Sequence, residues 1–204
     1  MKSNDLSTDV KAIRKEPDLS ADNKLVSDRD SELLSAVEEP TLISRDLAKA
    51  FNTQIGHELG ANLQYIGIAA YFQQRHLPLL AKLFFAQAEE ERQHALKFVN
   101  YILDVRGELQ IPTITSPAIP LGSAQDAVAA ALTWEREVTA QITGLMDHAV
   151  NENDYLAQSF LQWFVDEQLE EVVKMDRLLS VIRQSGEKNL LMVEAYLVHI
   201  EKAS

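Results

Sequence analysis

Four long stretches of this chain carry the apolar periodicity of helices that pack side by side, and a glutamate interrupts each pattern near its middle. Residues three and four positions apart share one face of a helix, so each of these glutamates falls on the face expected to be buried. A buried carboxylate is unfavourable unless it is protonated, paired or bound to a metal. The chain must therefore fold so that these four carboxylates share a compensated environment.

The helix boundaries follow from capping residues and helix breakers. The four long helices are expected at Ser44 to about Arg75, Pro78 to Gly107, Ser123 to Val150, and from the turn at 151–154 to about Gln184. Three prolines between residues 108 and 122 prevent a continuous helix there and predict an extended crossover. A shorter amphipathic helix is expected at 187–199. The predicted fold is all-α: an up-down four-helix bundle with one long crossover and a short fifth, C-terminal helix.

The first part of the chain differs from the rest. Residues 1–43 are predicted to form a polar N-terminal extension, with a possible short helix at 28–38 that Pro40 would end. A solvated tail is the favoured interpretation, and a docking or assembly arm is the alternative. Residues 44–204 are predicted to form the bundle together with the C-terminal helix.

Composition limits the chemistry that the chain can perform. The formal net charge of −12 argues against binding to nucleic acid or to anionic membranes and favours the attraction of cations. The absence of cysteine leaves histidine, carboxylate and carbonyl oxygen as metal ligands. No apolar run approaches the roughly 20 residues of a membrane span, and no signal-peptide pattern is present. A cytoplasmic location is expected.

The interrupting residues predict a metal site. They lie at mid-helix and therefore at one height of the bundle: Glu58, Glu91, Glu135 and Glu171, with His94 one turn after Glu91 and Gln168 one turn before Glu171. A structural ion-pair network is the alternative, but no Lys or Arg occupies the apolar seams. Two divalent cations would balance four carboxylates. The pattern thus predicts a dinuclear centre in which Glu91 bridges the two metals.

The combined motifs resemble those of the non-haem bacterial ferritins, in the ferritin-like superfamily. The resemblance covers about residues 44–197. It depends on Glu58 with Tyr65 seven residues later, on the sequence Glu-Glu-Arg-Gln-His at 90–94, on Glu135, and on the glutamate-rich stretch at 162–171. The spacings from Glu58 to Glu91 and from Glu91 to Glu135 are also similar to those of bacterial ferritins.

The resemblance implies roles for individual residues. One iron would be held by Glu58, Glu91 and His94. The second iron would be held by Glu91, Glu135 and Glu171, with Gln168 adjacent. A third, looser iron site would use Glu90, Glu167 and Glu170 together with Glu171. Tyr65 would lie beside the centre as an electron donor or as a hydrogen-bond donor to a ligand, and an ordinary core tyrosine is the alternative.

The chain differs from related families at several motif positions, and these differences favour a non-haem ferritin. Bacterioferritins and rubrerythrin-like proteins carry a second Glu-x-x-His, whereas here Val173 follows Glu170 and Lys174 follows Glu171 at that spacing. The second metal would therefore lack an imidazole ligand, and the two positions would differ in affinity. Arg92 stands where bacterioferritins place their haem-binding methionine, so no haem is expected. The remaining histidines are expected at the surface or at helix ends: His57, His76, His148 and His199.

The function implied by the resemblance is iron storage with ferroxidase activity. Fe(II) would be oxidised by dioxygen, or by hydrogen peroxide, and the ferric product stored as mineral inside a homo-oligomeric shell of 24 subunits. Two alternatives remain open. One is a structural or iron-buffering shell subunit with little oxidase activity, and the other is a diiron or dimanganese oxidase that stores no mineral.

Overall fold

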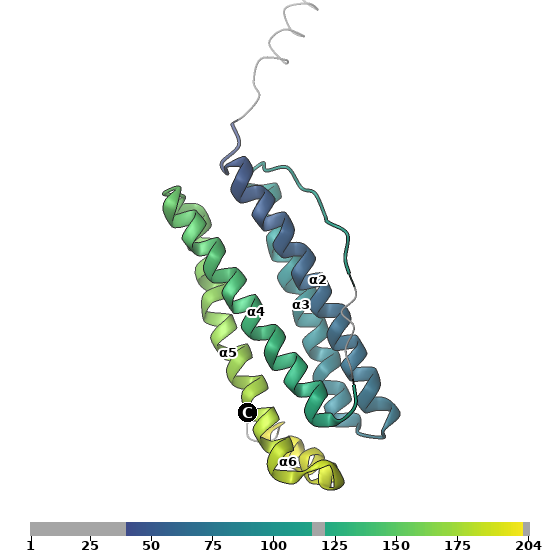
Figure 1. Ribbon diagram of the computed structural model, residues 1–204. Helices are drawn as coiled ribbons and strands as arrows, with labels where there is room; N and C mark the ends of the chain where they lie inside the picture. The colour runs from purple at the N-terminus through teal and green to yellow at the C-terminus, as the bar shows by residue number, and fades with distance from the viewer. Residues whose placement is uncertain (1–39, 116–120, 202–204) are drawn as a thin grey trace, which may run out of the picture. The chain divides into compact units, whose positions relative to one another are not determined.

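The computed structural model describes residues 40–115 and 121–201, which fall almost entirely within one compact unit, Thr41–Ser204. This part of the chain contains five α-helices, one 3-10 turn and no strand (Figure 1). The elements are α2 Arg45–Gln74, α3 Pro78–Asp104, α4 Ala124–Asn151, α5 Tyr155–Ser185, η1 Glu187–Asn189 and α6 Leu190–Glu201. The predicted all-α bundle with a short C-terminal helix is confirmed. The predicted helix at 28–38 lies outside the described residues, and the domain boundary at 43/44 stays a prediction.

The helices begin at the capping residues that the sequence indicated. The hydroxyl oxygens of Ser44 and Ser123 accept hydrogen bonds from backbone N–H groups three residues later, and the Asp154 carboxylate does the same at the start of α5. Pro78 occupies the first turn of α3, where its missing N–H removes no helical hydrogen bond. Local chemistry therefore sets all four starting points.

The C-terminal ends of three helices use non-glycine residues in the left-handed region. His76, Arg106 and Asn153 each have φ of 57°, and the backbone N–H groups that follow them bond back to carbonyls of the last helical turn. Helix α3 accordingly ends at Asp104, three residues before the end at Gly107 that the sequence predicted. Arg106, not the glycine, adopts the left-handed conformation, and the Gly107 N–H bonds to the Ile102 carbonyl at 2.7 Å.

The described part of the crossover lies along α2. The Asn52 side chain donates to the Glu108 carbonyl and accepts from the Gln110 N–H, each at 2.8 Å. Further along α2, Gly56 leaves room for Pro112, whose Cγ would lie 2.5 Å from a Cβ at position 56. The crossover therefore leads away from the end of α3, so α4 starts at the far end of the bundle and runs parallel to α3 (Figure 1).

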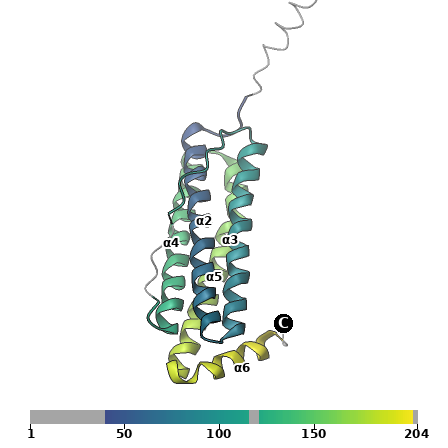
Figure 2. The same ribbon diagram turned by 90° about the vertical axis from the view of Figure 1, so that its right-hand side faces the viewer.

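The C-terminal segment closes that far end. The Glu187 carboxylate accepts from the N–H groups of Ala124 and Gln125 at 3.1 and 2.9 Å, at the start of α4. Glu194 on α6 accepts from the first N–H groups of α3, both at 2.9 Å. Carboxylates at helix N-termini satisfy unpaired donors and interact favourably with the helix dipole. Figure 2 shows α6 lying across this end of the bundle.

Two apolar cores fill the bundle and leave a polar layer between them. One core, toward the α6 end, includes Phe72, Phe84 and Met175. The other, toward the opposite end, includes Phe51 and Phe98. Asn62 of α2 is half-buried and donates a hydrogen bond to the Ala88 carbonyl of α3 at 2.7 Å. Among the described residues, none of the helices is both long enough and apolar enough to cross a membrane.

Candidate metal centre

The four long helices each contribute a glutamate to the interior of the bundle. Glu58 is on α2, Glu91 on α3, Glu135 on α4 and Glu171 on α5, and each is at most 3% exposed. His94, one turn after Glu91, is also 3% exposed. The structure thus places all five predicted ligands on buried helix faces, as the sequence pattern indicated.

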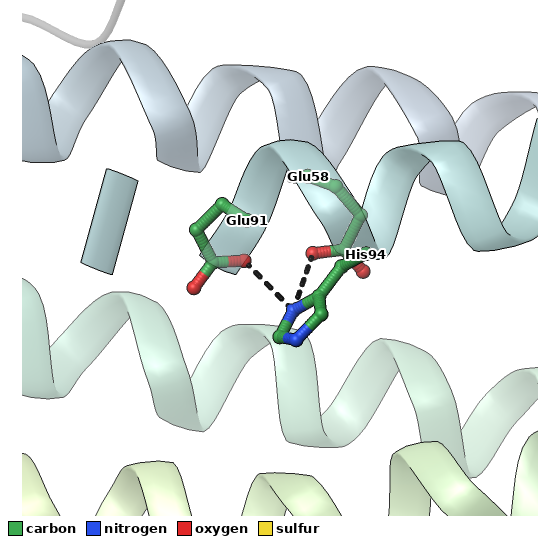
Figure 3. A group of neighbouring side chains, drawn as sticks. All are labelled: Glu58, Glu91 and His94. Atoms are coloured by element: carbon green, nitrogen blue, oxygen red, sulfur yellow. Dashed lines mark hydrogen bonds and ion pairs between the residues drawn. The ribbon is translucent and has the colours of Figure 1, made fainter. Parts of the chain in front are cut away.

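Three of these residues form a compact cluster. The Nδ1 atom of His94 lies 3.3 Å from Glu91 Oε2 and 4.0 Å from Glu58 Oε2 (Figure 3). Each of the three residues offers a ligand atom within 4.8 Å of the others, and within the described ranges no other set of three or more His, Asp or Glu residues does so. The spacing is small enough for one metal ion to contact all three side chains.

Two carboxylates of the buried layer have raised pKa values and unpartnered oxygen atoms. Burial, followed by the nearby Glu91 carboxylate, raises the pKa of Glu58 well above its ordinary value. Gln54 Nε2 donates to Glu58 Oε1 at 2.9 Å, whereas Glu58 Oε2 is buried with no hydrogen-bond partner. Burial and Glu91 also raise the pKa of Glu135, whose Oε2 atom is likewise unpartnered. Unpartnered carboxylate oxygens and raised pKa values fit a site that accepts divalent cations.

Aromatic side chains enclose the imidazole. The ring of His94 makes edge-on contacts with Trp163 and Phe164, with centroid distances of 5.5 and 5.8 Å. Phe164 also packs on Phe98 at 4.4 Å, which joins this wall to the apolar core. The contacts keep His94 away from solvent and hold the ring beside the carboxylates.

Glu135 is held by a neighbouring phenol. The Tyr65 hydroxyl donates a hydrogen bond to Glu135 Oε1. Burial, followed by the Glu135 charge, raises the pKa of Tyr65 well above its ordinary value, so the hydroxyl keeps its proton and acts as a donor. Tyr65 is fully buried and stacks on Phe84, so it is also a core residue.

Glu171 is held by two other partners. Gln87 Nε2 donates to its Oε2 atom at 2.7 Å, and Lys174 Nζ lies 3.2 Å from its Oε1 atom. Burial raises the pKa of Glu171, and the positive charge of Lys174 partly opposes this shift. Among the described residues, Glu91, Glu135 and Glu171 do not form a second compact cluster like that of Glu58, Glu91 and His94.

Lys174 corrects one expectation from the sequence. The seams contain no Lys or Arg, a pattern that predicts a layer without a cation. The lysine nevertheless reaches the layer from a half-buried position beside the seam, because its side chain is long and flexible. Its ammonium also pairs with Glu90 at 2.9 Å.

The residues of the predicted third iron site are more exposed to solvent than the Glu58–Glu91–His94 cluster. Glu90 and Glu167 are half-buried and Glu170 is exposed. Gln168 is buried, and its Oε1 atom accepts a hydrogen bond from Thr139 at 3.1 Å. Among the described residues, Glu90, Glu167 and Glu170 do not form a cluster like that of Glu58, Glu91 and His94.

Among the other histidines, His148 pairs with Glu152 at 3.0 Å near the end of α4.

Two buried amides were not identified as site residues from the sequence. Gln54 contacts Glu58, and Gln87 contacts both Glu91 at 3.3 Å and Glu171. Each glutamine lies four residues before a buried glutamate on the same helix, a spacing that brings side chains together. The four-residue spacing could have identified both glutamines from the sequence, but polar residues at this spacing are also common on solvated helix faces.

Comparisons with known proteins agree with this arrangement. A family model described as the ferritin-like domain matches residues 48–185. A ferritin BfrB from Mycolicibacterium smegmatis is 44% identical over 144 residues, which are 71% of this chain and 79% of that protein. A bacterial non-heme ferritin from Staphylococcus aureus is 33% identical over 146 residues, covering 72% and 88% of the two chains.

A solved structure agrees as well. An open pore ferritin from the archaeon Archaeoglobus fulgidus superimposes with a TM-score of 0.74 at 28% identity, covering 78% of this chain and 98% of that one. The match therefore extends over nearly the whole of the archaeal chain. From its sequence, its bundle and its relatives, this chain belongs to the ferritin family.

Proposed function

We propose that this protein stores iron and oxidises it, taking up Fe(II), transferring electrons to dioxygen at a dinuclear centre and keeping the ferric product inside an oligomeric shell. The observation that carries the proposal is the buried cluster of Glu58, Glu91 and His94, with an unpartnered carboxylate oxygen directed at it. Membership of the ferritin family supports storage, and the relatives are named as ferritins.

The donor set suits Fe(II) as a substrate. Carboxylate oxygen and one imidazole nitrogen are ligands that divalent iron accepts, and the absence of thiolate avoids tight binding of softer metals. Glu58, Glu91 and His94 would hold the first ion. Glu91 would also contact the second, together with Glu135 and Glu171. The looser set at Glu90, Glu167 and Glu170 remains a proposal for iron in transit.

The chain's own groups would position the substrates and balance charge. Each Fe(II) gives up one electron, and dioxygen that receives two electrons and two protons leaves as hydrogen peroxide. Tyr65 would keep Glu135 oriented through its hydroxyl, and Gln87 would orient Glu91 and Glu171. Trp163 and Phe164 would limit the access of water to His94.

Storage requires a closed assembly, and the family resemblance suggests 24 subunits. Exposed apolar side chains on α6 support an oligomer, because Leu191 and Met192 are 73% and 66% exposed in the isolated chain. Native mass measurement is the test. A mass of many subunits is expected, whereas a monomer or dimer would contradict storage and favour an oxidase that keeps no mineral.

Aerobic titration with Fe(II), followed by absorbance of ferric species, tests the oxidase activity. The parent protein should oxidise added Fe(II) faster than the buffer does, up to two ions per subunit. Glu91→Ala should lose most of this fast phase because Glu91 serves both metal positions. Glu89→Ala is the matched control: Glu89 is exposed on the same helix and pairs with Arg92, so its loss should leave the rate unchanged.

An unchanged oxidation rate in Glu91→Ala would refute the proposed centre. If the parent assembles into a shell but oxidises iron no faster than buffer, the chain is an iron-buffering subunit without oxidase activity. The two measurements together therefore separate storage with oxidation from either property alone.

A further inference from the structure

Lys174 is a charged partner of the proposed metal layer to which the proposed function gives no role. It lies on α5 three residues after Glu171, and its ammonium contacts Glu171 Oε1 at 3.2 Å and Glu90 Oε2 at 2.9 Å. The ion pair thus joins α5 to α3 beside the centre. Lysine is ordinarily a cation at neutral pH, so these two contacts pair its positive charge with a carboxylate of α3 and a carboxylate of α5.

We propose that the Lys174 ammonium is a built-in counter-cation of the second metal position, which must swing away before a second divalent cation can bind Glu171. This inference rests on the proposed function, because it assumes that the layer binds two metals. It assigns Lys174 as a cause of an order of filling, in which the Glu58–Glu91–His94 cluster binds metal first and the position beside Lys174 binds it second.

The hydrogen bonds of Glu171 support this order. Both of its carboxylate oxygens are engaged, Oε1 by Lys174 and Oε2 by Gln87, so a metal that binds Glu171 must compete with these partners, and it is repelled by the charge of the Lys174 ammonium. At the first position, by contrast, Glu58 Oε2 has no hydrogen-bond partner and is available at once. The first metal therefore meets no paired lysine at Glu58, whereas the second approaches a carboxylate that is already paired with Lys174.

Burial decides which partner of Glu171 moves. The side chain of Lys174 is 39% exposed, so its ammonium can turn into water without leaving a buried charge unpaired. Gln87 is 0% exposed and also donates to Glu91, so its displacement would leave a buried amide without acceptors. The same movement of Lys174 would free Glu90, which lies at the edge of the layer with a side chain 46% exposed.

The Lys174 ammonium offsets the negative charge of the buried carboxylates when no metal is bound. Without metal, Glu58, Glu91, Glu135 and Glu171 lie in one buried layer, and Lys174 supplies a positive charge that no seam residue provides. When a divalent cation arrives, the ammonium becomes a repulsive neighbour. Lys174 should therefore stabilise the empty layer and weaken binding of the second metal.

Anaerobic calorimetric titration with Co(II) tests this proposal without turnover. The probe is Co(II) alone, added to the full-length, assembled protein after treatment with a chelator. The parent should bind in two steps, the second weaker than the first. Lys174→Gln keeps a polar side chain but removes the charge, and it should strengthen the second step about tenfold, or about 1.4 kcal/mol, without changing the first.

Two further variants complete the design. Lys174→Arg retains the charge and should keep the weak second step of the parent. Lys49→Gln removes a charge from an exposed position on α2 and should change neither step. A thermal melt of each variant shows whether it is folded before titration.

The outcomes separate this inference from the function on which it rests. A first step that is present, with a second step that Lys174→Gln leaves unchanged or weakens, overturns the counter-cation role and leaves the metal centre in place. If the parent shows no first step, both the proposed function and this inference fail. A strengthened second step in Lys174→Gln, with parent behaviour in Lys174→Arg, supports it.

Discussion

Replacing Glu58 by glutamine should stabilise the metal-free protein at neutral pH. Glu58 is fully buried, and burial and the neighbouring Glu91 raise its pKa well above the ordinary value of 4.5. A group with a raised pKa in the folded state binds its proton more tightly there than in the unfolded chain. Its stabilising contribution is complete below pH 4.5 and is lost as the pH rises through the folded-state pKa. The amide of Glu58→Gln does not titrate, so the variant does not lose this stability as the pH rises.

The stability lost by the parent protein depends on the pH interval between 4.5 and neutral pH. Each pH unit between 4.5 and the folded-state pKa removes about 1 kcal/mol from the free energy of unfolding, so the loss at pH 7 is at most about 3 kcal/mol. For a chain of this size about 1 kcal/mol corresponds to 2–4 °C in Tm. A loss of about 3 kcal/mol would therefore lower the Tm of the parent by roughly 6–12 °C relative to the variant.

Thermal unfolding of chelator-treated protein between pH 5 and pH 8 measures this difference. The Tm gap between Glu58→Gln and the parent should be small near pH 5 and grow as the pH rises. Glu137→Gln removes an exposed carboxylate from α4 and should track the parent at every pH. A gap that stays constant with pH, or a variant that is less stable at pH 8, would refute the reasoning about Glu58.

Three other predictions concern single contacts. Glu194→Gln weakens the two hydrogen bonds that Glu194 accepts from the start of α3, so the Tm should fall by the equivalent of about 2 kcal/mol, measured by calorimetry. Gly56→Ala places a methyl group against Pro112, so proteolysis within residues 108–115 should become faster, and an unchanged cleavage pattern would contradict the close packing. Tyr65→Phe removes the hydroxyl bonded to Glu135, so the metal-free protein should lose about 1–3 kcal/mol of stability while the first Co(II) binding step persists.

Helix positions could be predicted because local chemistry determines them. Ser44, Pro78 and Ser123 start helices in the structure as the sequence indicated, since capping and proline geometry act over a few residues. The end of α3 differs from the prediction because Arg106, a residue with no intrinsic preference for the left-handed region, adopts it in place of Gly107. Such a choice depends on tertiary packing that the local sequence does not encode.

The buried layer of glutamates was predictable for a different reason. Glu58, Glu91, Glu135 and Glu171 interrupt apolar seams, and a seam position in a bundle is a buried position. The partners of these glutamates were harder to identify. Lys174 reaches the layer from beside a seam, and Gln87 contacts two helices at once. Both contacts depend on side-chain length and on the packing between helices, which the periodicity of one helix does not determine.

We propose that the polar layer of the bundle binds iron. Anomalous diffraction at the iron absorption edge, from crystals soaked anaerobically with Fe(II), tests it most directly. The proposed centre predicts a strong peak within bonding distance of Glu58, Glu91 and His94, and a weaker second peak toward Glu135 and Glu171. Iron bound elsewhere on the protein, with no anomalous peak in this layer, would contradict it.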